Sequence, residues 1–107
     1  MAIIAGVGMA PFGRHPDKTV ADLGVDAALE ALADASLPWG AIEGMYCAAA
    51  GAGLTPGTRV SAALGLTGIP VVNIDNASAS GSSAFRSACR DVDTGAADIV
   101  LAVGVGK

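Results

Sequence analysis

The chain has 107 residues, of which 52% are apolar and 15% charged, which is the composition of one small packed domain. Ten acidic and six basic residues give a net charge of −4, and no run of basic residues occurs. The chain therefore lacks the basic surface that binds nucleic-acid phosphates, which argues against a nucleic-acid-binding protein. No apolar stretch reaches the roughly 18 residues that cross a membrane, and the N-terminus lacks the pattern of a secretory signal. We therefore expect a cytoplasmic protein that binds neither nucleic acid nor membranes.

Residues 2–9 form an apolar run rich in Ile and Val, which predicts a buried strand. Thr19 followed by Asp22 is typical of a capping box, and apolar residues then recur at helical spacing. This pattern predicts a helix from Thr19 to Ala35, because Pro38 prevents its continuation.

The rest of the chain repeats the alternation of strand and helix. We predict strands at 42–49, at 70–78 (PVVNIDNAS) and at 98–105, with helices at about 59–66 and at 78–94. Strands that alternate with helices indicate a layered α/β fold around a mostly parallel sheet. No helix follows the last strand, so we expect one face of the sheet to need cover from another segment or another chain.

Several chemically capable side chains have simpler interpretations. Cys47 and Cys89 do not have the spacing of a metal pair, so we expect buried thiols. His15 lies in a polar loop with no neighbour to orient it as a base, and the sequence assigns no residue to a metal or to a bound cofactor. Four acidic residues at helical spacing are expected to face solvent opposite the apolar stripe: Asp22, Asp26, Glu30 and Asp34.

The junction between the third strand and the following helix is the most informative segment. Ser78 begins the predicted helix, where free N–H groups and the helix dipole stabilise an anion. Ala79 and Gly81 leave the approach open to a substrate. The alternative is that Ser78 is only an N-cap and Gly81 only a close-packing residue.

The stretch VVNIDNASASGSSAFRSACRDVDTGAADIVLAVGVGK resembles the nucleophile region of the thiolase superfamily, especially the sterol-carrier-protein and lipid-transfer-protein type of acetyl-CoA acetyltransferase. That pattern has Asn, four residues and then Cys-Ala-Ser-Gly. Asn73 matches its Asn, Ala79, Ser80 and Gly81 match Ala-Ser-Gly, and Ser78 stands where the family has its catalytic cysteine. The start of the chain, GVGMAPFGRHPDKTVADLGVDAALEALADASL, is similar to the opening strand and helix of the same enzymes.

The resemblance implies a layered thiolase-like fold, with residues 1–107 as the N-terminal part of the N-domain. It also implies an acyltransferase that acts on the carbon–carbon bond of a 3-ketoacyl-CoA, with the coenzyme A thioester as substrate and no permanently bound cofactor. A second catalytic cysteine, histidines and a CoA-binding loop domain are expected further along such an enzyme, so this chain alone is not a complete catalyst. The resemblance further implies a homodimer that pairs through the strand near Val71–Asp75.

The serine at position 78 leaves three explanations open, because a hydroxyl ionises only with a positioned base. It is an engineered replacement of the cysteine, a natural member with non-covalent chemistry, or an inactive scaffold subunit. Some thiolase-like proteins without the cysteine resemble acyl-CoA retro-aldolases that act with a zinc-ribbon and OB-fold partner subunit. In such a protein, Ser78 would shape the pocket rather than attack the substrate.

Overall fold

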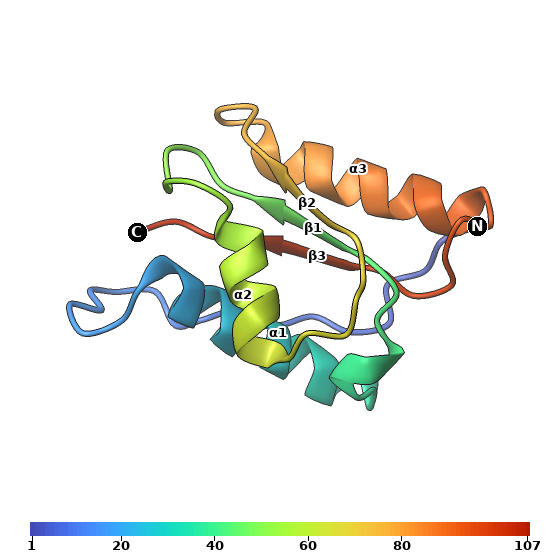
Figure 1. Cartoon of the computed structure of the whole chain (residues 1–107), viewed down its shortest axis with the longest axis horizontal. Coiled ribbons are helices and arrows are strands. Elements are labelled where there is room, and N and C mark those ends of the chain that lie inside the picture. Colours follow the sequence, from blue (N-terminus) through green and yellow to red (C-terminus); the bar gives the residue numbers. More distant parts are fainter.

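The chain forms a three-stranded parallel sheet with helices on both faces in the computed structural model, which describes residues 1–107 (Figure 1). In chain order the elements are α1 (Val20–Ala35), the short 3-10 helix η1 (Trp39–Ala41), β1 (Met45–Ala48), α2 (Pro56–Leu64), β2 (Val71–Ile74), α3 (Ser80–Asp93) and β3 (Leu101–Gly104). The strand order is β2-β1-β3, and the middle strand β1 is parallel to both neighbours. The predicted α/β class with a parallel sheet is therefore confirmed.

Helix α1 begins and ends where its sequence signals lie. The amide of Asp22 donates to Thr19 Oγ1 over 3.1 Å, and the Thr19 amide donates to Asp22 Oδ2 over 2.8 Å, which completes the capping box. The helix ends at Ala35, and the next residue, Ser36, has a left-handed φ of 55°. The capping residues thus fix both ends of the helix before tertiary packing is considered.

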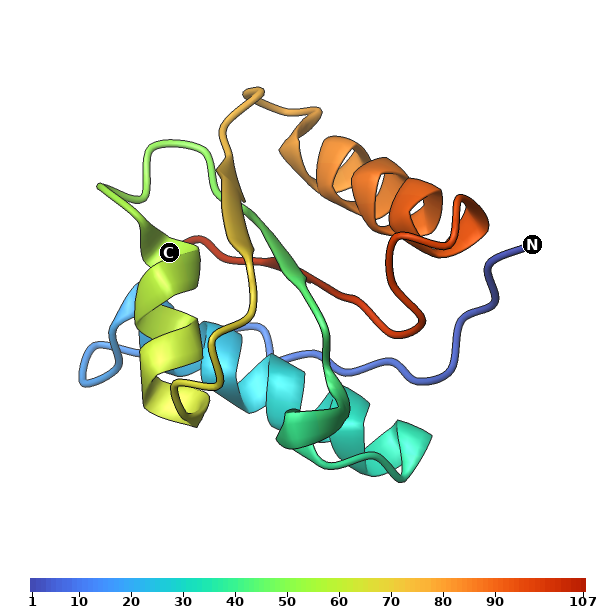
Figure 2. The same cartoon turned by 45° about the vertical axis from the view of Figure 1, so that its right-hand side comes forward.

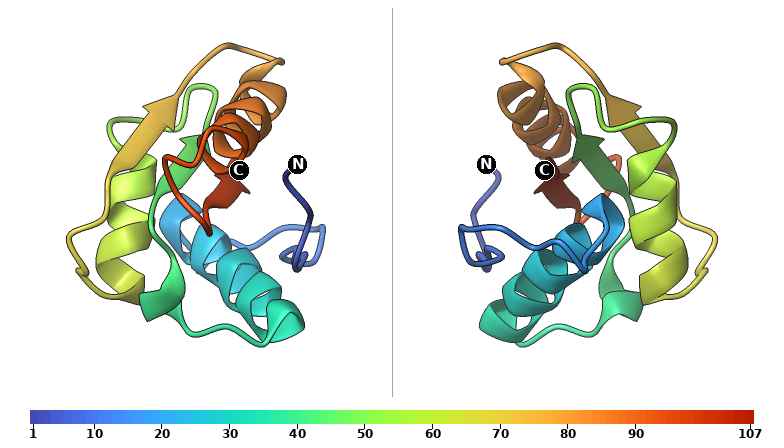
Figure 3. Two further views of the ribbon diagram at one scale, coloured as in Figure 1. Left: turned by 90° about the vertical axis from the view of Figure 1, so that its right-hand side faces the viewer. Right: turned by 90° about the vertical axis from the view of Figure 1, so that its left-hand side faces the viewer.

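The helices lie in two layers, one on each face of the sheet. Helices α1 and α2 cover one face, and α3 covers the other (Figures 2 and 3). The expectation that one face would lack a covering helix is therefore wrong. The chain passes from β1 through α2 to β2 and then crosses the middle strand to β3, so right-handed connections require α2 and α3 to lie on opposite faces.

The N-terminal apolar run is not a strand, which corrects the prediction for residues 2–9. The segment lies against α1, where Gly6 packs so closely that an added Cβ would lie 2.5 Å from the Ala31 carbonyl oxygen. The Val7 amide donates to Asp34 Oδ2 over 2.8 Å instead of joining a sheet ladder. An apolar run fits a helix surface as well as a strand, and the two glycines of this run favour the close approach to α1. The large apolar side chains that remain exposed along it are Ile3, Ile4, Val7 and Met9.

The other elements have the predicted order with shifted ends. Helix α2 begins at Pro56, three residues before the predicted start, because proline suits the first position of a helix. Helix α3 begins at Ser80 rather than at residue 78. The strands are shorter than predicted, since only four residues of each are paired.

The core lies between the sheet and the helices α1 and α2. Met45 and Cys47 of β1 and Val60 of α2 are almost completely buried there. On the opposite face, α3 contributes Ala84 and Ala88, whose small side chains bring the helix close to β1 and β3. No helix of the molecule is both long enough and apolar enough to cross a lipid bilayer.

Candidate active site

The candidate site lies at the edge of the sheet where the three parallel strands end. The loop after β1 leads to α2 on one face, and the loop after β2 leads to α3 on the other, so the two loops diverge above this edge (Figure 1). Ligands of parallel α/β sheets bind in such crevices. An open hollow of about 250 Å³ lies here, lined by Ala48, Ala49, Ala50, Ala77, Ser80, Gly81, Gly104 and Val105.

Ser78 lies in the loop between β2 and α3 and is exposed to solvent. The N-cap of α3 is Ala79, so Ser78 stands one residue outside the cap and does not start the helix as the sequence suggested. Its neighbours Ala77 and Ser80 line the hollow, whereas Ser78 itself does not. The alternative role of Ser78 as an N-cap is wrong, because no side chain caps α3.

The backbone around Ser78 offers free hydrogen-bond donors. The amides of Ala79 and Ser80 donate to the carbonyl oxygens of Asn76 and Ala77, which closes two tight turns. The amides of Ser78, Gly81 and Ser82 donate to no group of the chain. These donors lie at the positive end of the α3 dipole, and they favour a negatively charged atom beside Ser78.

Ala77, immediately before Ser78, has a left-handed φ of 48°. This conformation costs a residue with a Cβ about 1–2 kcal/mol. Two side chains hold it: Asp75 Oδ1 accepts from the Ala77 amide over 3.1 Å, and the Ser80 hydroxyl donates to the Ala77 carbonyl oxygen over 2.7 Å. The loop that presents Ser78 is therefore fixed by specific hydrogen bonds.

Asn73, the asparagine of the family pattern, connects two elements below the site. Its Oδ1 accepts a hydrogen bond of 2.6 Å from the Gly57 amide in the first turn of α2. Helix α2 has no side-chain cap from its own N-cap residue, Thr55, so Asn73 satisfies one of its free donors. No local sequence signal indicates this contact, because the two residues belong to different elements.

The two cysteines occupy different environments, and neither lies in the loop that carries Ser78. Cys47 is buried in the core, and burial raises the pKa of its thiol to about 11. Its thiol is therefore protonated and unreactive near neutral pH. Cys89 is half-buried on α3, so the prediction of a fully buried thiol is confirmed for Cys47 alone.

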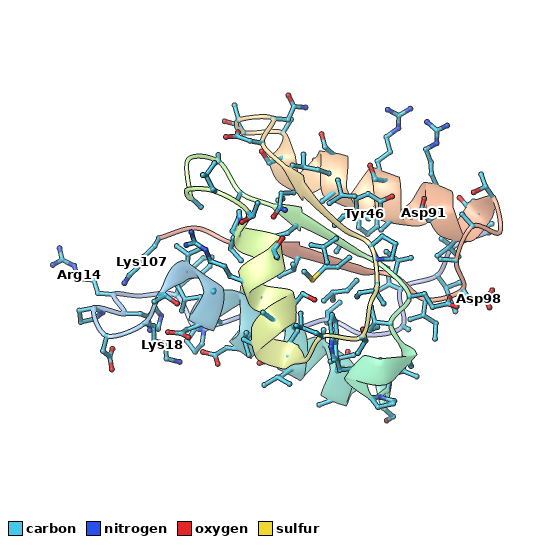
Figure 4. The ribbon with its side chains drawn as sticks, in the orientation of Figure 1. Arg14, Lys18, Tyr46, Asp91, Asp98 and Lys107 are labelled. Atoms are coloured by element: carbon cyan, nitrogen blue, oxygen red, sulfur yellow. The ribbon has the colours of Figure 1, made fainter.

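The remaining candidate residues stabilise local structure away from the hollow. His15 Nε2 lies 2.7 Å from the Pro11 carbonyl oxygen, within the loop before α1. Asp26 forms an ion pair of 2.5 Å with Lys18, which lies near Lys107 at the other end of the chain (Figure 4). No three His, Cys, Asp or Glu side chains of the chain are close enough together to hold a metal ion.

One polar pair has no signal in the sequence. The Tyr46 hydroxyl donates a 2.7 Å hydrogen bond to Asp91 Oδ2, which connects β1 to α3 (Figure 4). This bond, with burial as a smaller cause, raises the pKa of Tyr46 above its ordinary value. Only the fold brings these residues together, since 45 positions separate them in the sequence.

Comparison with known proteins agrees with this architecture. The family model described as "Thiolase, N-terminal domain" matches residues 2–107. Sterol carrier protein 2 from Gallus gallus is 39% identical in an alignment of 104 residues that covers 94% of this chain and 19% of that protein. Benzoylsuccinyl-CoA thiolase subunit BbsB from Thauera aromatica is 38% identical over 94% of this chain and 26% of its own length. An acetyl-CoA acetyltransferase from Methanocaldococcus jannaschii is 37% identical over 97% of this chain and 28% of its own length.

Solved structures show the same fold. The 3-oxoacyl-[acyl-carrier-protein] synthase III from Aquifex aeolicus VF5 superposes with a TM-score of 0.77 at 24% identity, over 82% of this chain and 30% of that one. The Ltp2-ChsH2(DUF35) aldolase superposes with a TM-score of 0.76 at 24% identity, over 92% of this chain and 26% of that one. The chain spans between 19% and 28% of the curated relatives named above. By the match over nearly its whole length, the chain belongs to the thiolase N-terminal domain family.

Proposed function

We propose that this chain is the N-terminal part of a thiolase-like enzyme that makes or breaks a carbon–carbon bond beside a coenzyme A thioester, with 3-ketoacyl-CoA as the substrate class. The observation that carries the proposal is the position of Ser78, exposed at the carboxyl edge of the sheet among free backbone amides. Two relatives named as a CoA thiolase subunit and an acetyl-CoA acetyltransferase support the substrate class.

The backbone amides supply the electrostatic part of this chemistry. Cleavage or condensation beside a thioester carbonyl develops negative charge on an oxygen atom. Fixed N–H donors that point at this oxygen stabilise the transition state, because they need no reorganisation during the reaction. The amides of Ser78, Gly81 and Ser82 are the donors that this chain contributes.

Ser78 limits the covalent route. Its hydroxyl forms no hydrogen bond in the chain, so no carboxylate, imidazole or amine among these residues acts on it as a base. A covalent acyl-serine requires such a base, and an oxygen ester returns its acyl group to CoA less readily than a thioester does. Acyl transfer through Ser78 therefore depends on a base supplied from outside the 107 residues.

The unassisted hydroxyl favours a second candidate, in which an acyl-CoA is cleaved by a retro-aldol reaction without a covalent intermediate. The chain shares its fold with an aldolase whose name includes a DUF35 component. In this alternative, a zinc-ribbon and OB-fold partner subunit completes the site, and Ser78 shapes the pocket. A non-catalytic scaffold that stabilises such a partner is the remaining alternative.

Three variants separate these functions when they are measured on the whole protein that contains this chain. Ser78→Cys should give or greatly increase thiolysis of a 3-ketoacyl-CoA with free CoA. Ser82→Cys, which places a thiol at an exposed position in the first turn of α3, should not. Retro-aldol cleavage of a β-hydroxyacyl-CoA that survives Ser78→Ala would support the aldolase. Absence of both reactions in all variants, with and without partner subunits, would leave only the scaffold and would refute the proposed catalysis.

A further inference from the structure

We infer that Ser80 is a positioning residue for the candidate site: its hydroxyl holds Ala77 in the left-handed conformation and thereby fixes the side chain at position 78. This inference rests on the proposed function, because it concerns the same loop. The proposed chemistry gives no role to Ser80, the serine of the Ala-Ser-Gly pattern, and this inference assigns it one.

The burial of Ser80 is the first observation. Ser80 is only 5% exposed, although it lies at the first position of α3. The residues on either side of it, Ala79 and Gly81, are exposed. A buried hydroxyl is retained at little cost only when both its donor and its acceptor are satisfied. The backbone amide of Asn76 donates to Ser80 Oγ over 2.7 Å, and the Ser80 hydroxyl donates to the Ala77 carbonyl oxygen over 2.7 Å.

The conformation of Ala77 is the second observation. Of the non-glycine residues with positive φ, Ser36 and Thr55 carry a polar side chain, and only Ala77 has none to stabilise that conformation locally. The restraint on Ala77 therefore comes from other residues. Because Ser80 is bonded to backbone groups on both sides of the Asn76–Ala77 peptide, its hydroxyl determines the direction in which the chain reaches position 78.

The same contact keeps the free donors in place. The Ala77 carbonyl oxygen accepts from the amide of Ser80 over 3.2 Å and from its hydroxyl over 2.7 Å, and it accepts no bond from the Gly81 amide, which therefore stays free. Without the hydroxyl, Ala77 can relax to a negative φ, and position 78 then moves relative to the start of α3. A thiol at that position would lose part of the stabilisation of its thiolate.

The test measures the reactivity of a thiol placed at position 78. In Ser78→Cys protein, iodoacetamide labelling is followed against pH and resolved by site, since trypsin leaves position 78 in peptide 60–86 and Cys47 and Cys89 in other peptides. We expect the midpoint of labelling at position 78 to lie below the ordinary cysteine value of about 8.5. Adding Ser80→Ala should raise this midpoint and slow labelling at pH 7 by about tenfold. Ser87→Ala, farther along α3 and outside the candidate site, is the control and should change the rate less than about twofold.

Rescue by glycine distinguishes positioning from a merely structural role. Glycine adopts a left-handed φ without strain, so Ala77→Gly in the protein that carries both Ser78→Cys and Ser80→Ala should restore most of the lost reactivity. Should Ser80→Ala fail to fold, Ala77→Val at the exposed position, which increases the strain, should reduce the reactivity in the same direction. Unchanged labelling in folded Ser80→Ala protein, or no rescue by Ala77→Gly, would overturn the inference. If the Ser80 effect on labelling is observed while neither thiolysis nor retro-aldol cleavage is found, the proposed function alone is refuted and the positioning role of Ser80 stands.

Discussion

The hydroxyl of Tyr46 in the middle strand and the carboxylate of Asp91 in α3 form a 2.7 Å hydrogen bond across the face of the sheet. The bond attaches the helix that follows Ser78 to the strand at the centre of the molecule. Because it favours the protonated phenol, it raises the pKa of Tyr46.

We predict a late alkaline transition for this tyrosine. The folded pKa is raised, so the stabilisation is complete below the unfolded value of about 10 and is lost as the pH rises through the folded pKa. The chain has a single tyrosine, so ultraviolet absorbance of the phenolate follows Tyr46 directly. Asp91→Asn should move the midpoint toward the unfolded value, and an unchanged midpoint would show that the carboxylate is not the cause.

Substitution of Gly57 should be strongly destabilising. A Cβ at this position would lie 2.5 Å from Cys47 Cβ and 2.7 Å from Asn73 Oδ1, so Gly57→Ala must move α2 away from the sheet. We expect a loss of about 1–3 kcal/mol in the free energy of unfolding, measured in urea. Gly81→Ala is the matched control, since no atom lies within 4 Å of its added Cβ, and it should leave stability unchanged or raised.

The side chain of Asn73 should contribute to stability through α2. Asn73→Ala removes the acceptor of the Gly57 amide, and we expect a loss of about 1 kcal/mol, as for other helix caps. Asn73→Asp keeps an acceptor oxygen at the same place and should retain most of the stability. Equal losses in the two variants, measured by thermal unfolding, would contradict the capping role.

The two cysteines should react in a fixed order. Cys89 is half-buried, whereas Cys47 is buried and has its pKa raised to about 11, so labelling of the folded chain at mildly alkaline pH should modify Cys89 first and leave Cys47 protected. The raised pKa also means that stability is complete below the unfolded value of about 8.5 and falls as the pH rises toward about 11. Early labelling of Cys47 in folded protein would disprove its burial.

The edge strand β2 should mediate self-association if the proposed homodimer through Val71–Asp75 forms. β2 pairs only with β1, and Val72 on it is 42% exposed, which leaves an apolar edge without a partner. Val72→Lys should shift the protein from dimer to monomer in analytical ultracentrifugation. Thr67→Lys, at an exposed position in the loop before β2, is the control and should leave the association state unchanged.

Local sequence signals predicted those features that depend on neighbouring residues. The capping box of Thr19 and Asp22 fixed the start of α1, and the alternation of apolar segments indicated the α/β class. The pattern around Ser78 indicated the family, because its residues lie close together in the chain, between Asn73 and Gly81. The helical spacing misplaced the start of α3 by two residues, since the bonds of Ser80 and Asp75 to Ala77 hold a turn immediately before the helix.

Only the tertiary structure decided which distant residues meet. The apolar run at 2–9 is compatible with a strand or with packing on a helix, and its glycines and the Asp34 carboxylate on α1 determine the outcome. The contacts of Asn73 with Gly57 and of Tyr46 with Asp91 likewise follow from strand order and helix placement. Sequence alone therefore determined the class, the family and the chemistry available at position 78. The surroundings of that position depend on hydrogen bonds and packing between separate elements, which no local pattern encodes.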